Sequence, residues 1–493
     1  MAHRHRPLVL GTLIISMFMG SIEGTIIATA MPDIVANLGG FSLYSWVFSS
    51  YLLMQAVSIP IFGKLADLFG RKPVFIAGTV IFLVGSILCG LAPSMTWLIV
   101  FRFVQGLGAG AIQPISLTIV GDIYTIEERA RIQGWLASVW GVSSVLGPLA
   151  GGLIVEYWHW SWVFWINVPF GILAIIGLAV FLREDFERKR HKVDYLGAAL
   201  FFVSIGSLMM VLIQGGVEWD WNSPVILGLS ALAVGAFIAF LMVEARASEP
   251  IMPLDLWRKR LIATANIMTL AAGMVMIGLT TFLPTYVQGV MGESAIRAGF
   301  ARTAMSVGWP IAATITGRLL TRLGNRRPTL VGGCFLTLGG GTFLLMTGSS
   351  GPLYAAFGSF LVGCGLGMLN TSTVVSIQSS VEWARRGVAT ASNMFMRILG
   401  NALGAAVFGS VLNSMILSHL AAAGSGLGLE EFRLLLDSGV ASVRATPELL
   451  AALTAGLDAV YTGVFAASVL TLLLALLMPE VIRRSRQGKV ERT

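Results

Sequence analysis

The feature that most constrains this chain is a succession of apolar runs, each about twenty residues long, that repeats almost from one end to the other. A helix of ~20 mostly apolar residues can cross the hydrocarbon core of a bilayer. With 56% hydrophobic and only 12% charged residues, a soluble chain of this length would expose large apolar patches and aggregate. The sequence therefore predicts an all-α polytopic membrane protein.

Fourteen such runs can be delimited, as a group of six, a pair, and a second group of six. The expected spans lie near residues 8–30, 44–63, 73–92, 97–120, 132–156, 162–182, 195–215, 224–244, 263–285, 298–319, 329–348, 353–376, 388–414 and 457–480. The first run resembles the apolar part of a secretory signal, but Glu23 interrupts it and further spans follow. We therefore expect a retained first helix.

The distribution of basic residues predicts the orientation. Most of the 33 lysines and arginines stand in the segments between alternate runs. Short loops rich in Lys and Arg stay on the cytoplasmic side, so we expect a multi-pass protein of the cell membrane with both termini inside. The net charge of +8 does not indicate nucleic acid, because these charges are spread over short loops and form no continuous basic face.

A short charged segment occurs twice. GKLADLFGRKP, at 63–73, joins the second and third runs, and a diverged copy at 317–328 joins the tenth and eleventh. Two parallel halves with the binding site between them are a common transporter plan. We expect a six-helix half at 1–183, a linker with an inserted helix pair at 184–262, a second six-helix half at 263–480 with an outer loop at 415–456, and a cytoplasmic tail at 481–493.

Four segments together resemble a known family. Besides GKLADLFGRKP, they are RFVQGLGAG at 102–110, GVSSVLGPLAGG at 141–152 and EGTIIATAMP at 23–32. The chain resembles the major facilitator superfamily and, within it, the fourteen-helix drug:proton antiporter branch. The resemblance implies proton-coupled export of hydrophobic and/or cationic compounds by alternating access (multidrug efflux), with a contribution to antibiotic resistance. It also implies a monomer that uses a proton gradient and no cofactor.

Glu23 is the only carboxylate well inside an expected span. An ionised acid at the bilayer centre costs ~2.5–3.5 kcal/mol, so we expect Glu23 to face a cavity or to be protonated. Helical spacing puts it on one face with Thr12, Ser16, Met19, Ile27 and Ala30. One interpretation is a proton carrier that also attracts cationic substrates, and the other is a partner for a structural arginine. We favour the first, because intramembrane acids are usually functional.

Two arginines lie inside expected spans. Arg102 shares a polar stripe of its helix with Gln105 and Gln113. Its guanidinium stays charged at any working pH, so we expect it to change the proton affinity of a nearby carboxylate, or else to anchor helix packing. Arg397 shares a helix face with Asn393. Roles in substrate or proton coupling and in polar packing between helices explain Arg397 about equally well.

The charged loop is an expected gating element. Gly63 and Gly70 permit a tight turn. The resemblance implies that Asp67 docks at the amino end of the thirteenth span, where free N–H groups attract an anion, and that Arg71 pairs with Asp122. Such contacts hold only while the cytoplasmic side is closed, so they favour the outward-open state.

Small residues line one face of the fifth span. Ala137, Ser144, Gly147 and Gly151 lie within roughly an 80° arc at helical spacing. Small residues there let another helix approach closely, and Pro148 bends the helix. Gly141, which begins the segment GVSSVLGPLAGG, is a further candidate gating residue. Tight packing is one interpretation of this face. The resemblance adds that the packed helices act as an antiporter gate against leak.

The sequence also bears on other classes of function. Within transport, the alternative is a dedicated exporter or flippase of one endogenous metabolite or lipid. A membrane enzyme is disfavoured because no histidine lies within a span and no Ser-His-acid or metal-binding spacing occurs. A nucleotide-driven pump is disfavoured because there is no Walker-type glycine loop. A receptor stays open, although repetition with charges inside spans favours alternating access.

Overall fold

The computed structural model describes residues 5–40, 43–184, 194–216, 219–247, 249–422 and 447–480. Within these ranges the chain is helical, and its only β-type pairing is one isolated bridge between Gly215 and Trp219. The predicted tail at 481–493 lies outside the described residues, as does most of the loop between the sixth and seventh runs. The prediction of an all-α polytopic fold is confirmed.

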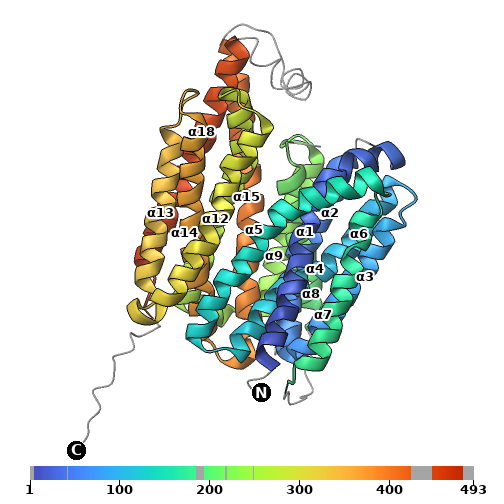
Figure 1. Cartoon of the computed structure of the whole chain (residues 1–493). Helices are drawn as coiled ribbons and strands as arrows, with labels where there is room; N and C mark the ends of the chain where they lie inside the picture. The colour runs from blue at the N-terminus through green and yellow to red at the C-terminus, as the bar shows by residue number, and fades with distance from the viewer. Residues whose placement is uncertain are drawn as a thin grey trace, which may run out of the picture.

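The first helices form one bundle, at the right of Figure 1. It comprises α1 (Arg6–Leu38), α2 (Tyr44–Phe69), α3 (Arg71–Gly90), α4 (Met95–Ile123), α5 (Ile126–Tyr157), the short α6 (Trp162–Trp165) and α7 (Asn167–Phe181). Local sequence sets two of the starts. Ser94 caps α4, and Thr125 with Glu128 forms a capping box at α5. Buried apolar side chains of this bundle form two clusters, and the larger one also includes side chains from later helices.

The later helices form a second bundle, at the left of Figure 1. It comprises α10 (Leu254–Arg258), α11 (Arg260–Thr285), the π-helical η3 (Tyr286–Val290), α12 (Ala295–Leu323), α13 (Arg326–Leu344), α14 (Gly351–Ser380), the short η4 (Trp383–Arg385), α15 (Arg386–Ala422) and α18 (Pro447–Leu477). These helices bury a core of their own. In Figure 1, α18 ends at the lower side of the molecule, where α1 begins.

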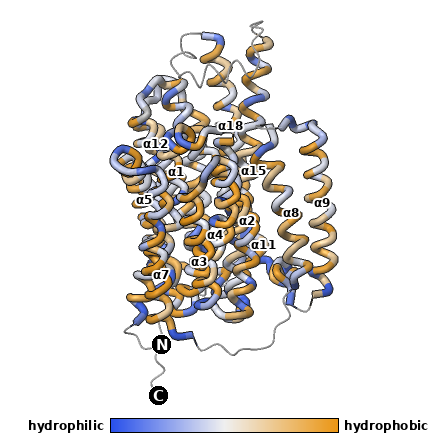
Figure 2. Tube along the Cα trace, turned by 90° about the vertical axis from the view of Figure 1, so that its right-hand side faces the viewer, coloured by the Kyte–Doolittle hydropathy of each residue, from blue (hydrophilic) through white to orange (hydrophobic). Residues whose placement is uncertain are grey.

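Two further helices stand at the edge of the molecule (Figure 2). They are α8 (Tyr195–Gln214) and α9 (Pro224–Glu244), and they pack against each other. Phe201 of α8 lies against Phe240 of α9 and Phe395 of α15, with ring centroids 5.3 and 5.6 Å apart. Because α8 also packs on α2, the pair attaches where one helix of each bundle meets the other.

The two copies of the charged segment make the same kind of turn. α2 leads into α3 through Gly70 at φ +95°, and α12 leads into α13 through Gly324 at φ +75°. Positive φ is strained for residues with a Cβ atom, so glycine is needed at both turns. The two copies of the charged segment therefore share a glycine turn with positive φ. The division into two six-helix halves stays a prediction.

Twelve helices in the described part of the chain are long and apolar enough to cross a membrane. α12 and α13 are not among them, although they contain 29 and 19 residues and pack along α14. α12 carries several arginines, among them Arg302 and Arg318, and α13 is rich in glycine. Both features lower hydropathy without shortening a helix. Fourteen spans and an inserted pair therefore stay predictions.

The predicted outer loop at 415–456 is helical at both of its ends. α15 continues to Ala422 and α18 already begins at Pro447, so the described parts of that segment are helical. The prediction followed the apolar run, whereas helix formation extends through small and polar residues that project beyond a bilayer core. Residues 423–446 lie outside the described ones.

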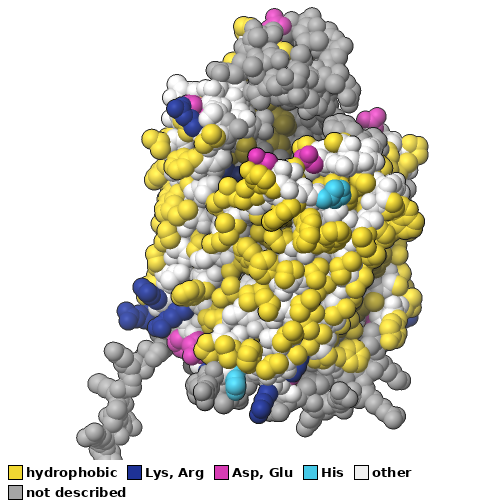
Figure 3. Space-filling view, turned by 45° about the vertical axis from the view of Figure 1, so that its right-hand side comes forward, with side chains coloured by type: hydrophobic (Ala, Val, Ile, Leu, Met, Phe, Trp, Pro, Cys, Tyr) yellow, Lys and Arg dark blue, Asp and Glu magenta, His cyan; other side chains and the backbone are white. Residues whose placement is uncertain are grey.

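The middle of the outer surface is apolar. Figure 3 shows hydrophobic side chains over most of one face, with acidic and basic side chains towards its two ends. Large exposed apolar side chains include Leu149 and Leu153 of α5 and Val234 of α9. In water such a surface would drive aggregation, so its natural surroundings are lipid.

Candidate functional site

A buried ion pair lies inside the first bundle. An Nη1 atom of Arg102, on α4, lies 2.6 Å from Oε1 of Glu23, on α1, and neither side chain is more than 1% exposed. Arg102 also donates to Gln105 Oε1 at 2.7 Å and, through Nε, to the carbonyl oxygen of Val47 at 3.0 Å. The Tyr51 ring lies under the guanidinium, 4.1 Å from its centre. The pair is therefore bonded to its surroundings on several sides.

The second oxygen of Glu23 has a partner from a distant part of the sequence. Asn167, at the start of α7, donates through Nδ2 to Glu23 Oε2 at 2.6 Å and to Ser86 Oγ at 3.2 Å. Gln105 Nε2 donates to the same Ser86 oxygen at 2.7 Å. The Oδ1 atom of Asn167 is buried without a partner. Five helices (α1, α2, α3, α4 and α7) thus supply one polar cluster.

This geometry bears on the alternatives that the sequence analysis left open for Glu23. The helix face that carries it is buried, as predicted, from Thr12 to Ala30. Glu23 itself, however, is 0% exposed and contacts Arg102 within its own bundle, and it lines neither described pocket. Taking an unpaired charge out of water costs far more than taking out a paired and hydrogen-bonded one. In the structure Glu23 is thus paired with Arg102 and does not face a described pocket, and the protonated form that the sequence analysis also allows stays a prediction.

The remaining predicted polar residues do not join this cluster. Gln113 is buried further along α4, roughly 12 Å from Gln105 at 1.5 Å per residue. Arg397 lies on α15, in the second bundle. Sequence reasoning did not find Asn167, Ser86 or Tyr51. An amide inside the run at 162–182 is a signal that could have indicated Asn167, because polar side chains within spans are usually paired.

A second polar group joins the two bundles at one end of the molecule. Asp67 accepts hydrogen bonds from the backbone N–H groups of Gly387 and Val388, at 2.9 and 2.8 Å, where α15 begins. Arg71 Nη2 lies 2.8 Å from Asp67. The contact implied by the resemblance is present, and the carboxylate meets the positive end of a helix dipole.

Arg71 and Asp122 extend this group. Arg71 Nε donates to Asp122 Oδ2 at 3.0 Å, and its Nη2 donates to the Trp383 carbonyl oxygen at 2.7 Å. The Trp383 ring lies 4.1 Å from the guanidinium centre. Arg386, which begins α15, donates to the other Asp122 oxygen at 3.0 Å. Trp383 and Arg386 were not predicted. They lie after α14, Trp383 in η4 and Arg386 at the first position of α15.

The prediction that Gly63 permits a tight turn is wrong, because Gly63 lies inside α2 and only Gly70 is at the turn. Gly63 instead lets α2 and α15 approach closely. A Cβ atom at Gly63 would collide with the Cβ of Ala391 and would lie 3.0 Å from the Gly387 carbonyl oxygen. Gln378 adds a further link between the bundles, because its Nε2 donates to the Leu117 carbonyl oxygen at 3.0 Å. This end of the molecule is therefore closed by contacts between the two bundles.

The small residues of α5 serve two different contacts. Gly147 and Gly151 allow α1 to pack closely against α5, because a Cβ atom at either position would collide with Thr25 or Ile26. Gly141 instead faces α12 of the other bundle, where a Cβ atom would lie 3.2 Å from the Ser306 carbonyl oxygen. Pro148 lies within the helix, between the two glycines that receive α1.

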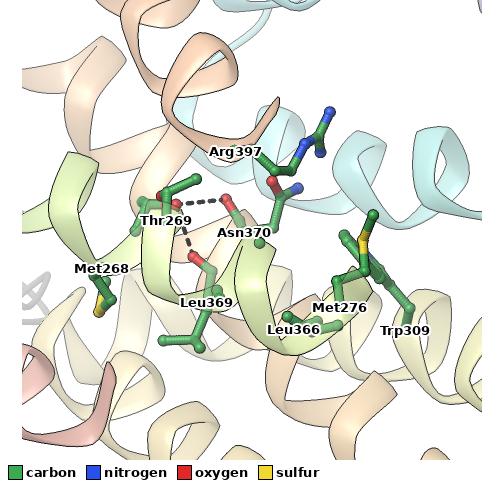
Figure 4. Close-up of a pocket in the computed structure, with 11 residues that line it drawn as sticks. Met268, Thr269, Met276, Trp309, Leu366, Leu369, Asn370 and Arg397 are labelled. Carbon is green, nitrogen blue, oxygen red and sulfur yellow. Dashed lines mark hydrogen bonds between the residues drawn. The ribbon is translucent and has the colours of Figure 1, made fainter. Parts of the chain in front are cut away.

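A small pocket lies in the second bundle, between α11, α12, α14 and α15. Arg397 and Asn370 project from α15 and α14 into it, and Trp309 and Met276 supply part of its apolar lining (Figure 4). No described acidic side chain lines it. The pocket combines apolar walls with one cationic group and several neutral polar ones.

Known proteins resemble the chain along most of its length. The family described as Major Facilitator Superfamily matches residues 13–405. Multidrug resistance protein 3 of Bacillus subtilis (strain 168) is 39% identical over 419 residues, 85% of this chain and 82% of that protein. Multidrug transporter protein MdtP of the same organism is 36% identical over 409 residues, 83% of this chain and 76% of that protein.

Two solved structures share the fold at low sequence identity. The human organic anion transporter MFSD10 (TETRAN) superposes with a TM-score of 0.64 at 13% identity, over 95% of this chain and 99% of that one. The proton:xylose symporter XylE gives a TM-score of 0.60 at 13% identity, over 96% of each chain. With apolar helices, a repeated charged loop and a family match over most of its length, the chain belongs to the Major Facilitator Superfamily of membrane transporters.

Proposed function

We propose that this protein is a proton-coupled antiporter of the fourteen-helix drug:proton branch, which exports hydrophobic and/or cationic compounds by alternating access. The observation that carries the proposal is Glu23, a titratable carboxylate buried in a membrane helix and bonded to Arg102. The names of the relatives support it, since two that resemble the chain along most of its length are called multidrug resistance and multidrug transporter proteins.

Glu23 is suited to carry the proton. Antiport requires a group that binds H⁺ in one state and releases it in the other, and arginine stays charged in both. The buried, unpartnered Oδ1 of Asn167 is a second favourable feature, because rotation of that amide would offer an acceptor to a protonated Glu23. Movement of Arg102 relative to Glu23 would then change the proton affinity through charge and hydrogen bonding.

The contacts of Asp67, Arg71 and Asp122 are suited to gating. They hold the ends of the two bundles together, so they stabilise only a state in which that end is closed. We assign that end to the cytoplasm because of its basic loops, which makes the state outward-facing. Antiport of this kind needs no cofactor beyond the proton gradient, and we propose that the protein works as a monomer.

Orientation in the cell membrane can be tested directly. We propose that all fourteen predicted spans, with α8 and α9 as the inserted pair, cross the bilayer with both termini inside. Single cysteines introduced within 184–192 should then react with impermeant reagents only from the cytoplasm, and those within 420–445 only from outside. Labelling of 184–192 from outside would overturn the orientation.

The alternative is a dedicated exporter or flippase of one endogenous metabolite or lipid. An apolar pocket with few polar groups suits either function. The decisive experiment uses proteoliposomes with an imposed pH gradient and a panel of dyes. Multidrug antiport predicts uphill movement of several unrelated dyes that compete with one another. Movement of none of them, with the gradient intact, would contradict the proposal, and movement of one alone would favour the alternative.

A further inference from the structure

Arg397 is a charged side chain without a partner in the second bundle. Its guanidinium lines the pocket, and no hydrogen bond or ion pair of that side chain occurs among the described residues. By contrast, Arg71, Arg102 and Arg386 each contact a carboxylate. A charge within a membrane protein is costly and is normally paired or faces a water-filled path. An unpaired one is therefore available to a ligand.

The surroundings of Arg397 indicate what such a ligand carries. No acidic side chain is among the described residues that line the pocket, so its formal charge comes from Arg397 alone. Asn370 adds an amide beside the guanidinium, while Trp309, Met276 and Leu366 provide apolar walls. Arginine presents a planar fork of donors that matches a carboxylate or phosphate. The apolar walls suit a hydrophobic body.

A second cation lies on the same face of α12 as Trp309. Arg302 precedes Trp309 by seven residues, which is close to two helical turns, so both side chains leave the helix on one side. Arg302 also has no hydrogen bond or ion pair among the described residues. The face of α12 that contributes to the pocket thus carries positive charge towards the helix end at Ala295.

We propose that Arg397 binds an anionic group of the transported compound, so that the protein prefers hydrophobic organic anions and zwitterions to the corresponding cations. The proposal rests on the export function proposed above only for the direction of transport, and of the hydrophobic and/or cationic compounds named there it selects hydrophobic ones that carry an anionic group. It restricts the substrate class, because Glu23 is buried and paired with Arg102 outside this pocket.

Two dyes that differ at one group provide the test. Rhodamine 110 has a free carboxylate, and rhodamine 123 is its methyl ester and carries net positive charge. Binding to purified protein in an uncharged detergent is measured by fluorescence polarisation. The native protein should bind rhodamine 110 more tightly, and Arg397→Gln should weaken that binding about tenfold or more, as expected for a hydrogen bond to a charged group. The affinity for rhodamine 123 should be unchanged or higher in the Arg397→Gln protein.

Controls separate charge recognition from structural damage. Arg397→Lys should retain part of the preference, and Arg318→Gln, at an exposed position of α12, should retain all of it. The two dyes are also compared on the native protein, and that measurement does not depend on whether any variant folds. Equal binding of both dyes by the native protein would overturn the proposal, as would an unchanged preference in a folded Arg397→Gln protein.

The anionic group could come from a solute or from a lipid headgroup. Repeating the measurement in nanodiscs of phosphatidylcholine, with and without phosphatidylglycerol, separates these sources. If phosphatidylglycerol displaces rhodamine 110 from the native protein but not from Arg397→Gln, the anion site stands and lipid is the source of the anion.

The same dyes distinguish failure of this proposal from failure of the proposed antiport, because dye binding needs no proton gradient. Loss of pH-driven export with the preference intact would refute antiport alone, and export without the preference would refute the anion site alone.

Discussion

Arg102 and Arg397 are arginines within the two bundles, but their surroundings differ. Arg102 is enclosed, with Glu23, Gln105 and the Val47 carbonyl oxygen as acceptors. Arg397 lines a pocket and has no such acceptor among the described residues. When Glu23 takes up a proton, Arg102 loses the negative partner of its ion pair. Arg397 has no such internal partner, so it attracts the negative charge of a ligand. On this difference rest our proposals that the first bundle couples protons and that the second recognises the substrate.

The largest effect is expected at the paired site. Glu23→Gln keeps the shape of the side chain but removes its titration, so pH-gradient-driven export in proteoliposomes should be abolished. Binding of the dyes at the Arg397 pocket should persist, because Glu23 lies outside that pocket. Glu23→Asp should keep partial activity, since the carboxylate is retained. Uphill export with a normal pH profile by Glu23→Gln would place the proton site elsewhere.

Stability should separate the two arginines. Arg102→Gln leaves Glu23 buried without its cation, and breaking a buried pair in this way costs about 3–5 kcal/mol. Arg397→Gln removes a charge that has no partner, so it should leave stability nearly unchanged or raise it. Thermal unfolding in detergent compares the two directly. Equal loss of stability in both variants would mean that Arg397 has an internal partner, and the contrast between the sites would fail.

A smaller effect is expected where the bundles meet. Asp67→Asn removes a charge from the amino end of α15, which is worth about 0.3–2 kcal/mol. A two-state equilibrium should then shift several-fold, so export slows while dye binding persists. Glu184 is a matched control, because it accepts from the backbone N–H groups of Arg71 and Lys72 at 2.8 and 2.9 Å within its own bundle. Equal slowing by Glu184→Gln would indicate general loosening in place of gating.

The sequence was most informative where the physics is local. The length of an apolar run decides whether a helix can cross a bilayer, and that length is visible without any neighbour. A charge inside such a run is equally visible, so Glu23, Arg102 and Arg397 were found as candidates. The turn at Gly70 was also predicted, because its positive φ excludes most other residues.

The tertiary structure decided which of these groups meet. Helical periodicity assigns Glu23 to a face of α1, but which neighbours that face meets depends on how the helices rotate and pack. Asn167 lies 144 residues away along the chain and still bonds to Glu23. The same packing gives Arg397 no hydrogen-bond or ion-pair partner among the described residues. The sequence by itself determined that this protein is a helical membrane transporter with charges in its helices, and only the packing decided which of these charges is paired within the described part of the chain.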